Sequence, residues 1–355
     1  MTAHAPAKPV DRFGTHRVVE PHGALPQAAL RLDATPVAFE NEILCDVEAL
    51  NIDSASFTQM REACSDDPKA IGELISATVR ERGKQHNPVT GSGGMFVGRV
   101  REIGERLRSS IALKPGDRIA SLVSLTLTPL HLEEILDVDL ETARVSVRGT
   151  AVLFESAGWS KLPGDLDDRV ALAVLDVAGA PAQVSRLCKP GMSVLVIGAA
   201  GKSGILSCAQ AKHRVGESGR VIAVVHSAAS GGAAILRKAG LANTVAEADA
   251  RDATALASRV ASLLPEGADL VINCVNCPGT ESASILCAKE GGTIYFFSMA
   301  TSFTAAALGA EGLGKDVTMI VGSGYAPNHA RIALETLRSH PAILAYFTDV
   351  YGTKK

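Results

Sequence analysis

Aromatic residues, long apolar runs and blocks of like charge are all scarce in this chain of 355 residues. Aromatic side chains make up 4% of the sequence. No apolar run approaches the roughly 18 residues of a membrane span. The formal net charge is −3 without a basic block, which argues against nucleic acid or a membrane as a partner. Met1 to Phe13 lack the apolar core of a signal peptide, so no secretory signal is expected.

The cysteines are odd in number and suggest no disulfide framework. In a long chain with no expected secretory signal, reduced thiols and a cytoplasmic location are the favoured interpretation. Cys274 and Cys277 have C-x-x-C spacing, but no second such pair or histidine pair completes a metal or redox site. The seven are Cys45, Cys64, Cys188, Cys208, Cys274, Cys277 and Cys287.

The chain changes its pattern near residue 170. Before that point it is β-rich, with a helical insert over Asp67 to Arg82 that Asp66 or Asp67 would cap. After it, strands and helices alternate, which predicts a parallel doubly wound sheet and an α/β fold. The length suits about two domains. The predicted strands are Ile43–Ala49, Phe96–Ile103, Arg118–Leu127 and Val145–Phe154, then Ser193–Ile197, Val221–Val225, Leu270–Asn273, Thr293–Phe297 and Thr318–Gly322.

A glycine-rich turn follows the strand Ser193–Ile197 and precedes a helical stretch. Gly198 would let the chain turn tightly, Gly201 would let backbone N–H groups approach a pyrophosphate, and Gly204 would let the helix pack on the strand. An ordinary strand–helix corner is the other interpretation, but the order of strand, turn and helix favours a dinucleotide. The predicted cofactor-binding residues are Gly198, Ala200, Gly201, Lys202, Ser203, Gly204, His226, Ser227, Cys274 and Val275.

Four segments resemble the medium-chain dehydrogenase/reductase superfamily. They are Ile43–Ala49, Gly98–Gly104, Lys114–Ile119 and Gly291–Ile294. The resemblance implies a GroES-like β-rich domain followed by a Rossmann domain. We therefore expect a GroES-like substrate and catalytic domain over 1–170, to which 340–355 returns, and a Rossmann dinucleotide-binding domain over 171–339.

The positions that bind zinc in the alcohol dehydrogenases of that superfamily differ here. Asp53 stands where the first cysteine ligand would be, Gly94 and Met95 replace the histidine and glutamate of the G-H-E motif, and the third ligand falls near Ala173. One carboxylate cannot form a three-ligand catalytic site, so we expect no zinc and no other metal.

A narrower resemblance is to the L-erythro-3,5-diaminohexanoate dehydrogenase family of lysine fermentation. It rests on Arg31–Asp33, Leu50–Gln59, Glu155–Trp159 and Asn273–Glu281. The resemblance implies a small diamino acid substrate, which loses its 3-amino group to give 5-amino-3-oxohexanoate as hydride passes to a nicotinamide cofactor.

The choice between NAD and NADP stays open at this point. The resemblance suggests NAD, but the second Rossmann strand ends at Val225 and His226, without the acidic residue that usually holds the adenosine ribose. Nearby residues would suit a 2′-phosphate, although they equally suit helix capping and the surface. They are Ser227, Ser230, Gly231, Arg237 and Lys238.

Asp53 is the first candidate for a carboxylate that meets the substrate, because the resemblance places it beside the nicotinamide. Asp176 is the second, and Ser54 lies where relatives keep a relay hydroxyl. Each carboxylate would also suit a structural role, Asp53 as the cap of a turn and Asp176 as the cap of a helix. The cation for the substrate carboxylate is open among three residues, Arg61, Lys161 and Arg99.

Two other functions remain open, a zinc-free quinone or enoyl reductase of the same superfamily and a nucleotide binder without activity. We also expect a homodimer, formed by a Rossmann edge strand, either Thr293–Phe297 or Thr318–Gly322.

Overall fold

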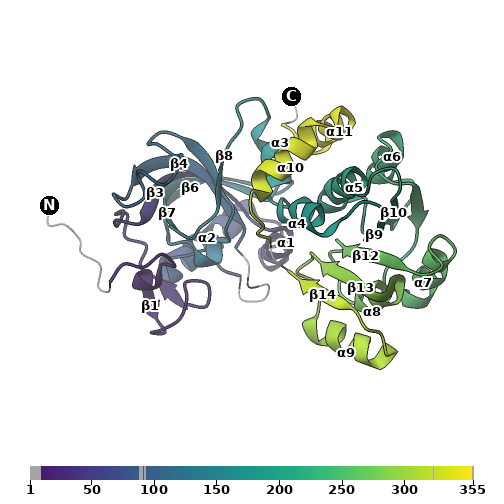
Figure 1. The fold of residues 1–355 in the computed structure, drawn as a ribbon. Coiled ribbons are helices and arrows are strands. Elements are labelled where there is room, and N and C mark those ends of the chain that lie inside the picture. Colours follow the sequence, from purple (N-terminus) through teal and green to yellow (C-terminus); the bar gives the residue numbers. More distant parts are fainter. Residues whose placement is uncertain (1–8, 88–90, 92, 323, 354–355) are drawn as a thin grey trace. The chain divides into compact units, whose positions relative to one another are not determined.

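The structure, a computed structural model, describes residues 9–87, 91, 93–322 and 324–353 (Figure 1). These residues form two compact units, which divide between Pro163 and Gly164. The expected boundary at residue 170 therefore lies inside the second unit, just after the start of helix α3 (Asp168–Leu175).

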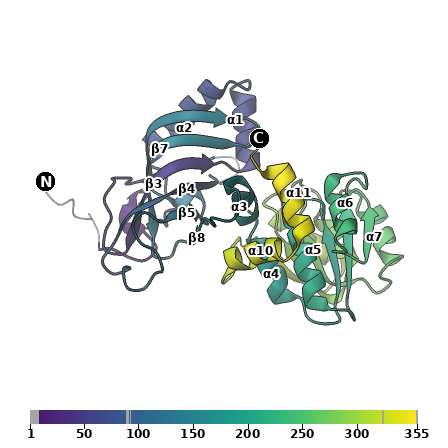
Figure 2. The same cartoon turned by 90° about the horizontal axis from the view of Figure 1, so that it is seen from above.

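The first unit is built on an antiparallel sheet with the strand order β6-β7-β3-β4-β5-β8. Helix α2 (Pro68–Arg82) confirms the predicted insert: Asp67 caps it, and its apolar face packs on β6 (Figure 2). β6 was not predicted. Only Leu130 and Val138 of its ten residues are buried, so the strand lacks a regular alternation of apolar and polar residues. The other elements are β1 (Val18–Glu20), β2 (Arg31–Leu32), β3 (Glu42–Asn51), α1 (Ser54–Ala63), β4 (Met95–Ile103), β5 (Arg118–Ser121), β6 (Leu130–Asp139), β7 (Arg144–Phe154) and β8 (Trp159–Lys161), with 3₁₀ turns at Thr15–Arg17 and Leu125–Leu127.

The second unit is a parallel sheet with the strand order β11-β10-β9-β12-β13-β14. This order confirms the predicted doubly wound sheet, and it places the point where the winding reverses between β9 and β12. The strands are β9 (Ser193–Ile197), β10 (Arg220–Val225), β11 (Thr244–Glu247), β12 (Ala268–Asn273), β13 (Ala288–Phe296) and β14 (Thr318–Val321).

Helices cover both faces of the parallel sheet. Helices α4, α5 and α10 pack together on one side, and α7, α8 and α9 form a row on the other (Figure 1). Among the described residues no single helix is long and apolar enough to cross a membrane; α3 and α4 reach that length and apolarity only as a pair, bent by 48°. Besides α3, the helices are α4 (Gly179–Leu187), α5 (Lys202–Val215), α6 (Gly231–Lys238), α7 (Ala253–Ala261), α8 (Glu281–Cys287), α9 (Phe303–Leu313), α10 (His329–Arg338) and α11 (Pro341–Tyr351).

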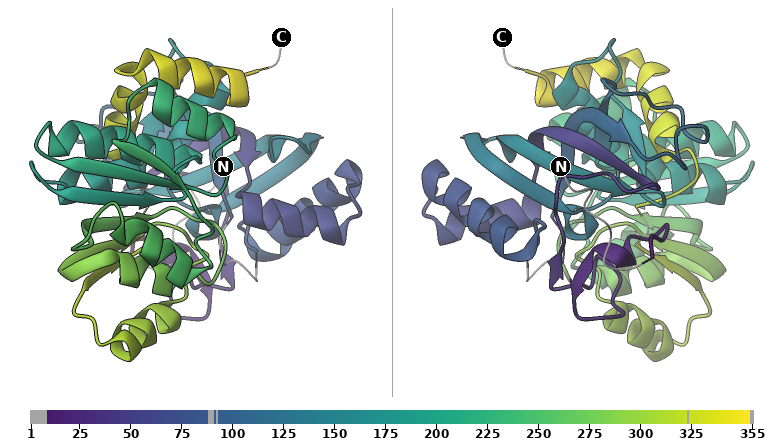
Figure 3. Two further views of the ribbon diagram at one scale, coloured as in Figure 1. Left: turned by 90° about the vertical axis from the view of Figure 1, so that its right-hand side faces the viewer. Right: turned by 90° about the vertical axis from the view of Figure 1, so that its left-hand side faces the viewer.

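We expected residues 340–355 to return to the first domain. The structure instead places the last helix, α11, in the second unit. It packs on α3, α6 and α10 within the second unit, where Figure 3 shows α10 and α11 in yellow. Ile343 and Phe347 are four residues apart, so they share one helical face, and both are buried. Burial of this face holds the chain end on the second unit.

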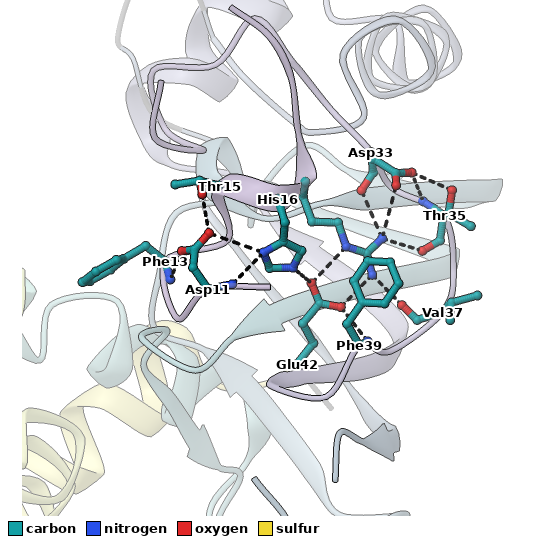
Figure 4. Close-up of polar contacts among 10 residues, drawn as sticks. Asp11, Phe13, Thr15, His16, Asp33, Thr35, Val37, Phe39 and Glu42 are labelled. Carbon is teal, nitrogen blue, oxygen red and sulfur yellow. Dashed lines mark hydrogen bonds and ion pairs between the residues drawn. The ribbon is translucent and has the colours of Figure 1, made fainter. Parts of the chain in front are cut away.

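A buried polar cluster ties the N-terminal segment to the start of β3 (Figure 4). The carboxylate of Glu42 accepts hydrogen bonds from Arg17 Nε at 2.9 Å and Arg17 Nη2 at 2.7 Å, and it lies 2.7 Å from His16 Nε2. The side chains of His16, Arg17 and Glu42 are fully buried. Burial by itself would raise the pKa of Glu42, but the hydrogen bonds from His16 and Arg17 and the Arg17 charge lower it below its ordinary value.

We expect Glu42→Gln to lower the free energy of unfolding by about 3–5 kcal/mol at pH 7, because it removes the nearer and fully buried counter-ion of Arg17 and leaves only Asp33, at 3.9 Å. Glu40→Gln is the matched control, since Glu40 forms only an exposed ion pair with Arg106 and should cost under about 1 kcal/mol. Urea denaturation measures both.

The lowered pKa of Glu42 also predicts how the stability of the fold depends on pH. Because folding lowers the pKa of Glu42, its ionised form stabilises the fold fully above about pH 4.5, and this stabilisation is lost as the pH falls from 4.5 through the lower pKa of the folded state. Glu42→Gln should flatten this part of the stability profile. An unchanged profile would contradict the assignment.

Candidate functional site

The glycine turn between β9 and α5 leaves the start of α5 open to an anion. Gly198 has φ of +77°, and a Cβ there would lie 3.0 Å from the Cys274 and Val275 backbone. A Cβ at Gly204 would lie 2.4 Å from the Gly198 carbonyl oxygen, so only glycine lets α5 pack this closely on the turn. Gly201 is the N-cap of α5 and makes no side-chain capping bond. The first N–H groups of α5 are therefore available to a phosphate.

Unlike Gly198 and Gly204, Gly201 is not crowded by backbone atoms of the protein. The nearest atom to a Cβ built on it is the Gly198 carbonyl oxygen, 3.7 Å away, which is ordinary contact. Its φ is −81°, which any residue adopts. Protein packing therefore does not require a glycine here, whereas the close approach of a pyrophosphate would.

A cavity of about 260 Å³ lies at the carboxyl ends of β9 and β10, beside this turn. Its lining is mostly apolar, with a charged wall formed by His226, Asp249 and Arg251. Its position outside the carboxyl ends of parallel strands, next to the point where the winding reverses, is that of a nucleotide site. The other lining residues are Ile197, Gly198, Val224, Val225, Ala248, Ala250, Val275 and Cys277.

The loop after β12 contributes Val275 to this cavity because Asn273 holds it in place. The buried Asn273 amide donates to Thr280 Oγ1 at 2.8 Å and Ser284 Oγ at 2.9 Å, and its Oδ1 accepts from the Val275 N–H at 2.9 Å. Burial raises the pKa of the Cys274 thiol to about 11, so this thiol stays protonated at neutral pH.

The predicted cofactor residues fall into three groups. Gly198, His226 and Val275 line the cavity. Ser227 lies in the exposed turn after β10, and Cys274 follows β12. The remaining residues form the turn and the first turn of α5: Ala200, Gly201, Lys202, Ser203 and Gly204. Asp249 and Arg251 were missed because β11 was not predicted; the A-D-A-R run ahead of α7 was the available signal.

Asp176 lies at the C-terminus of α3 and is paired with the cofactor loop. Its carboxylate lies 2.8 Å from Lys202 Nζ, and that ammonium group lies 5.9 Å from the centre of the Tyr351 ring. Lys202 is the first residue of α5. The structure therefore places the second predicted catalytic carboxylate where it neutralises a cation at the phosphate end of the turn.

Asp53 belongs to the first unit, where it caps α1. Its Oδ1 accepts a hydrogen bond from the Ser56 N–H at 2.9 Å, which is the structural role weighed for it above. Its Oδ2 is buried and has no hydrogen-bond partner among the described side chains, which do not include that of Ser54. Capping thus uses one carboxylate oxygen and leaves the other free. Ser54 begins α1, and its side chain lies outside the described part of the chain.

The neighbours of Asp53 include the positions that, by the resemblance described above, correspond to the zinc ligands of medium-chain alcohol dehydrogenases. Met95 pairs with Asn51 across β3 and β4, and a Cβ on Gly94 would lie 2.1 Å from the Asn51 carbonyl oxygen. Gly94 therefore brings the backbone of this loop against the residue two before Asp53. Within the described ranges, no group of three His, Cys, Asp or Glu side chains is arranged to hold a metal ion.

Structures in the same fold class confirm the α/β architecture. A mycobacterial quinone oxidoreductase in its native form matches with a TM-score of 0.52 and 20% identity, covering 90% of this chain and 84% of its own. The CurK enoyl reductase matches with a TM-score of 0.51 and 15% identity, covering 88% and 79% respectively. At these identities the likeness concerns the fold alone.

Two curated relatives have a much higher sequence identity to this chain. The L-erythro-3,5-diaminohexanoate dehydrogenase of Acetoanaerobium sticklandii is 52% identical over 96% of this chain and 98% of its own, and that of Fusobacterium nucleatum is 49% identical over the same shares. The family model for the N-terminal domain of L-erythro-3,5-diaminohexanoate dehydrogenase matches residues 16–163, close to the first unit. The chain therefore belongs to the L-erythro-3,5-diaminohexanoate dehydrogenase family.

Proposed function

We propose that this enzyme oxidatively deaminates L-erythro-3,5-diaminohexanoate to 5-amino-3-oxohexanoate in lysine fermentation, with NAD or NADP as hydride acceptor. The proposal depends on one observation. Two dehydrogenases of that name share 52% and 49% of their residues with this chain over 96% of its length. The substrate is a small diamino acid, and the expected location is the cytoplasm. All seven cysteines are free thiols, which suits a reducing compartment.

The second unit fits a dinucleotide. The open N-terminus of α5 would bind the pyrophosphate, and the apolar cavity between Val225 and Val275 would take the adenosine. Lys202 adds a cation at the phosphate end, where Asp176 holds it. The nicotinamide, when bound, accepts the hydride from the carbon that bears the 3-amino group.

In the first unit we assign the recognition of an ammonium group to Asp53. The 3-amino group must be neutral when the hydride leaves, because its lone pair stabilises the iminium that water then hydrolyses. Asp53 Oδ2 is the buried acceptor that remains after capping, and it suits either an ammonium group of the substrate or a proton on its way to water. The serines at 54 and 56 are the adjacent hydroxyl-bearing residues.

We also propose that the reaction needs no zinc. Glycine and alanine have no ligand atom in their side chains, and the methionine thioether is a poor partner for zinc, so Gly94, Met95 and Ala173 leave Asp53 as the one donor of the set. An amine differs from an alcohol in this respect, because it needs no metal to lower its pKa before hydride loss.

The direct test measures absorbance of the reduced nicotinamide while the purified protein is mixed with L-erythro-3,5-diaminohexanoate and each oxidised cofactor. We expect turnover that rises with pH as the 3-amino group loses its proton, and that survives chelation and dialysis. Turnover of enones or quinones without any turnover of the diamine would instead favour a quinone or enoyl reductase.

Asp53→Asn sharpens this test, because asparagine keeps an oxygen for the cap but removes the charge. It should lower kcat/KM for the diamine by about tenfold or more while cofactor affinity stays unchanged. Asp67→Asn is the matched control, since Asp67 caps α2 in the same unit and is exposed. Full activity of Asp53→Asn at every pH would reduce Asp53 to a helix cap and make Asp176 the next candidate.

Gly201→Val should weaken dinucleotide binding by roughly 100-fold or more, about 2.7 kcal/mol, because the side chain would occupy the position of the pyrophosphate. The fold should tolerate it, since nothing in the protein crowds that Cβ. Gly312→Val, at an open position of α9, is the control. Fluorescence titration with the reduced cofactor gives the affinities, and thermal unfolding verifies the fold; a folded variant with normal affinity would contradict the site.

We propose that the enzyme is a homodimer formed through β14. This strand is the edge of the parallel sheet, and Met319, Ile320 and Val321 on it are only half-buried. The preceding helix α9 exposes Phe303 and Leu308, which adds apolar area beside the edge. Light scattering should give about twice the 36.8 kDa of one chain, and Ile320→Lys should shift it towards the monomer. A monomeric parent protein would contradict this.

A further inference from the structure

β10 does not end in the acidic residue that is usual in a Rossmann fold. The neighbouring strand β11 supplies an acidic residue at its own carboxyl end. β11 runs parallel to β10, and Glu247 at its end is in register with Val225, the last residue of β10. The Glu247 side chain reaches across to the turn that follows β10, where its Oε2 accepts a hydrogen bond from the Ala228 N–H at 2.6 Å. A carboxylate therefore lies at the turn where a Rossmann fold meets the adenosine ribose.

Three groups near this turn that could receive a 2′-phosphate, in Ser230, Arg237 and Ala228, already form hydrogen bonds within the protein. Ser230 Oγ donates to the Ser227 carbonyl oxygen at 2.9 Å and accepts from the Ala233 N–H at 3.2 Å, as the N-cap of α6. Arg237 Nη1 donates to the Ala228 carbonyl oxygen at 2.9 Å. The Ala228 N–H, a natural donor to a phosphate, is already bonded to Glu247.

Arg251, which lines the cavity, is neutralised by Asp249. Arg251 contacts Asp249 with Nη2–Oδ2 of 2.7 Å and Nε–Oδ1 of 3.0 Å, and this two-point contact matches the planar guanidinium group to the carboxylate. The Arg251 hydrogen bonds hold the pKa of Asp249 well below its ordinary value, so the carboxylate is ionised at neutral pH. His226 lines the cavity beside this pair.

We propose that Glu247 excludes the 2′-phosphate of NADP from the turn after β10 and so makes the enzyme selective for NAD. A ribose 2′-hydroxyl is neutral and can donate a hydrogen bond to a carboxylate. A 2′-phosphate carries a charge of about −2 at pH 7, accepts hydrogen bonds at its oxygens and is repelled by the carboxylate. The single residue thus acts twice, by its charge and by occupying the Ala228 N–H. This inference rests on the proposed use of a nicotinamide cofactor.

Glu247→Gln is the test, because glutamine keeps an oxygen that can accept from the Ala228 N–H while it removes the charge. The matched control is Glu266→Gln, which removes the same charge from an exposed loop just before β12, at the amino-terminal end of that strand, whereas Glu247 lies at the carboxyl end of β11. Titration of each protein with NADH and with NADPH, followed by reduced-nicotinamide fluorescence, gives the two dissociation constants. Competition by AMP and by 2′-phospho-AMP gives the same comparison without the nicotinamide.

We expect the parent protein to bind NADH more tightly than NADPH by about tenfold or more, a preference that narrows as salt is added. Glu247→Gln should tighten NADPH binding by about fivefold or more and change NADH binding by less than about twofold, whereas Glu266→Gln should leave the ratio unchanged. Equal affinities in the parent protein, or equal weakening of both cofactors by Glu247→Gln, would overturn the inference and leave the proposed function intact. Failure to bind either dinucleotide would overturn the proposed function itself and this inference with it.

Discussion

The close packing of the α5 N-terminus on the end of β9 is the constraint on which the rest of the nucleotide site depends. The backbone of Gly198 lies against the Cys274–Val275 backbone, and Gly204 lies against the Gly198 carbonyl oxygen, with no room for a side chain at either position. Because both contacts involve backbone, neither can be relieved by a rotamer change. They fix the direction of α5, and so they aim its free N–H groups at one point in space.

In the proposed dinucleotide site, charged side chains lie near the positions that we assign to the two ends of the ligand. The phosphate end has the Lys202 ammonium group, held by Asp176. The ribose end has the Glu247 carboxylate, bonded to a backbone amide. A charge held by a partner keeps its position at less entropic cost than a free long side chain, so both ends are organised before any ligand arrives.

The two carboxylates predicted for catalysis show why a residue type does not define a role. Asp53 uses one oxygen as a helix cap and retains a second, buried acceptor. Asp176 pairs with a cation of the cofactor loop. Both are acidic residues beside helix ends, and the sequence around them does not distinguish the two situations. The difference comes from Lys202, which is distant in sequence from Asp176 but adjacent to it in the fold.

The sequence by itself determined the features that depend on neighbours along the chain. The glycine turn, the capped insert at Asp67 and the alternation of strands and helices all follow from local spacing, because a tight turn or a helix start is specified by a few consecutive residues. That Gly94 and Met95 stand where the resemblance places a histidine and a glutamate can likewise be seen from the residues alone. Only the tertiary structure decided which strand supplies an acidic residue to the turn after β10, and on which unit the last helix packs. Glu247 reaches the turn after β10 through parallel strand pairing, and α11 is held by burial of Ile343 and Phe347. Both depend on contacts between segments that are separated in the sequence, which no local pattern encodes.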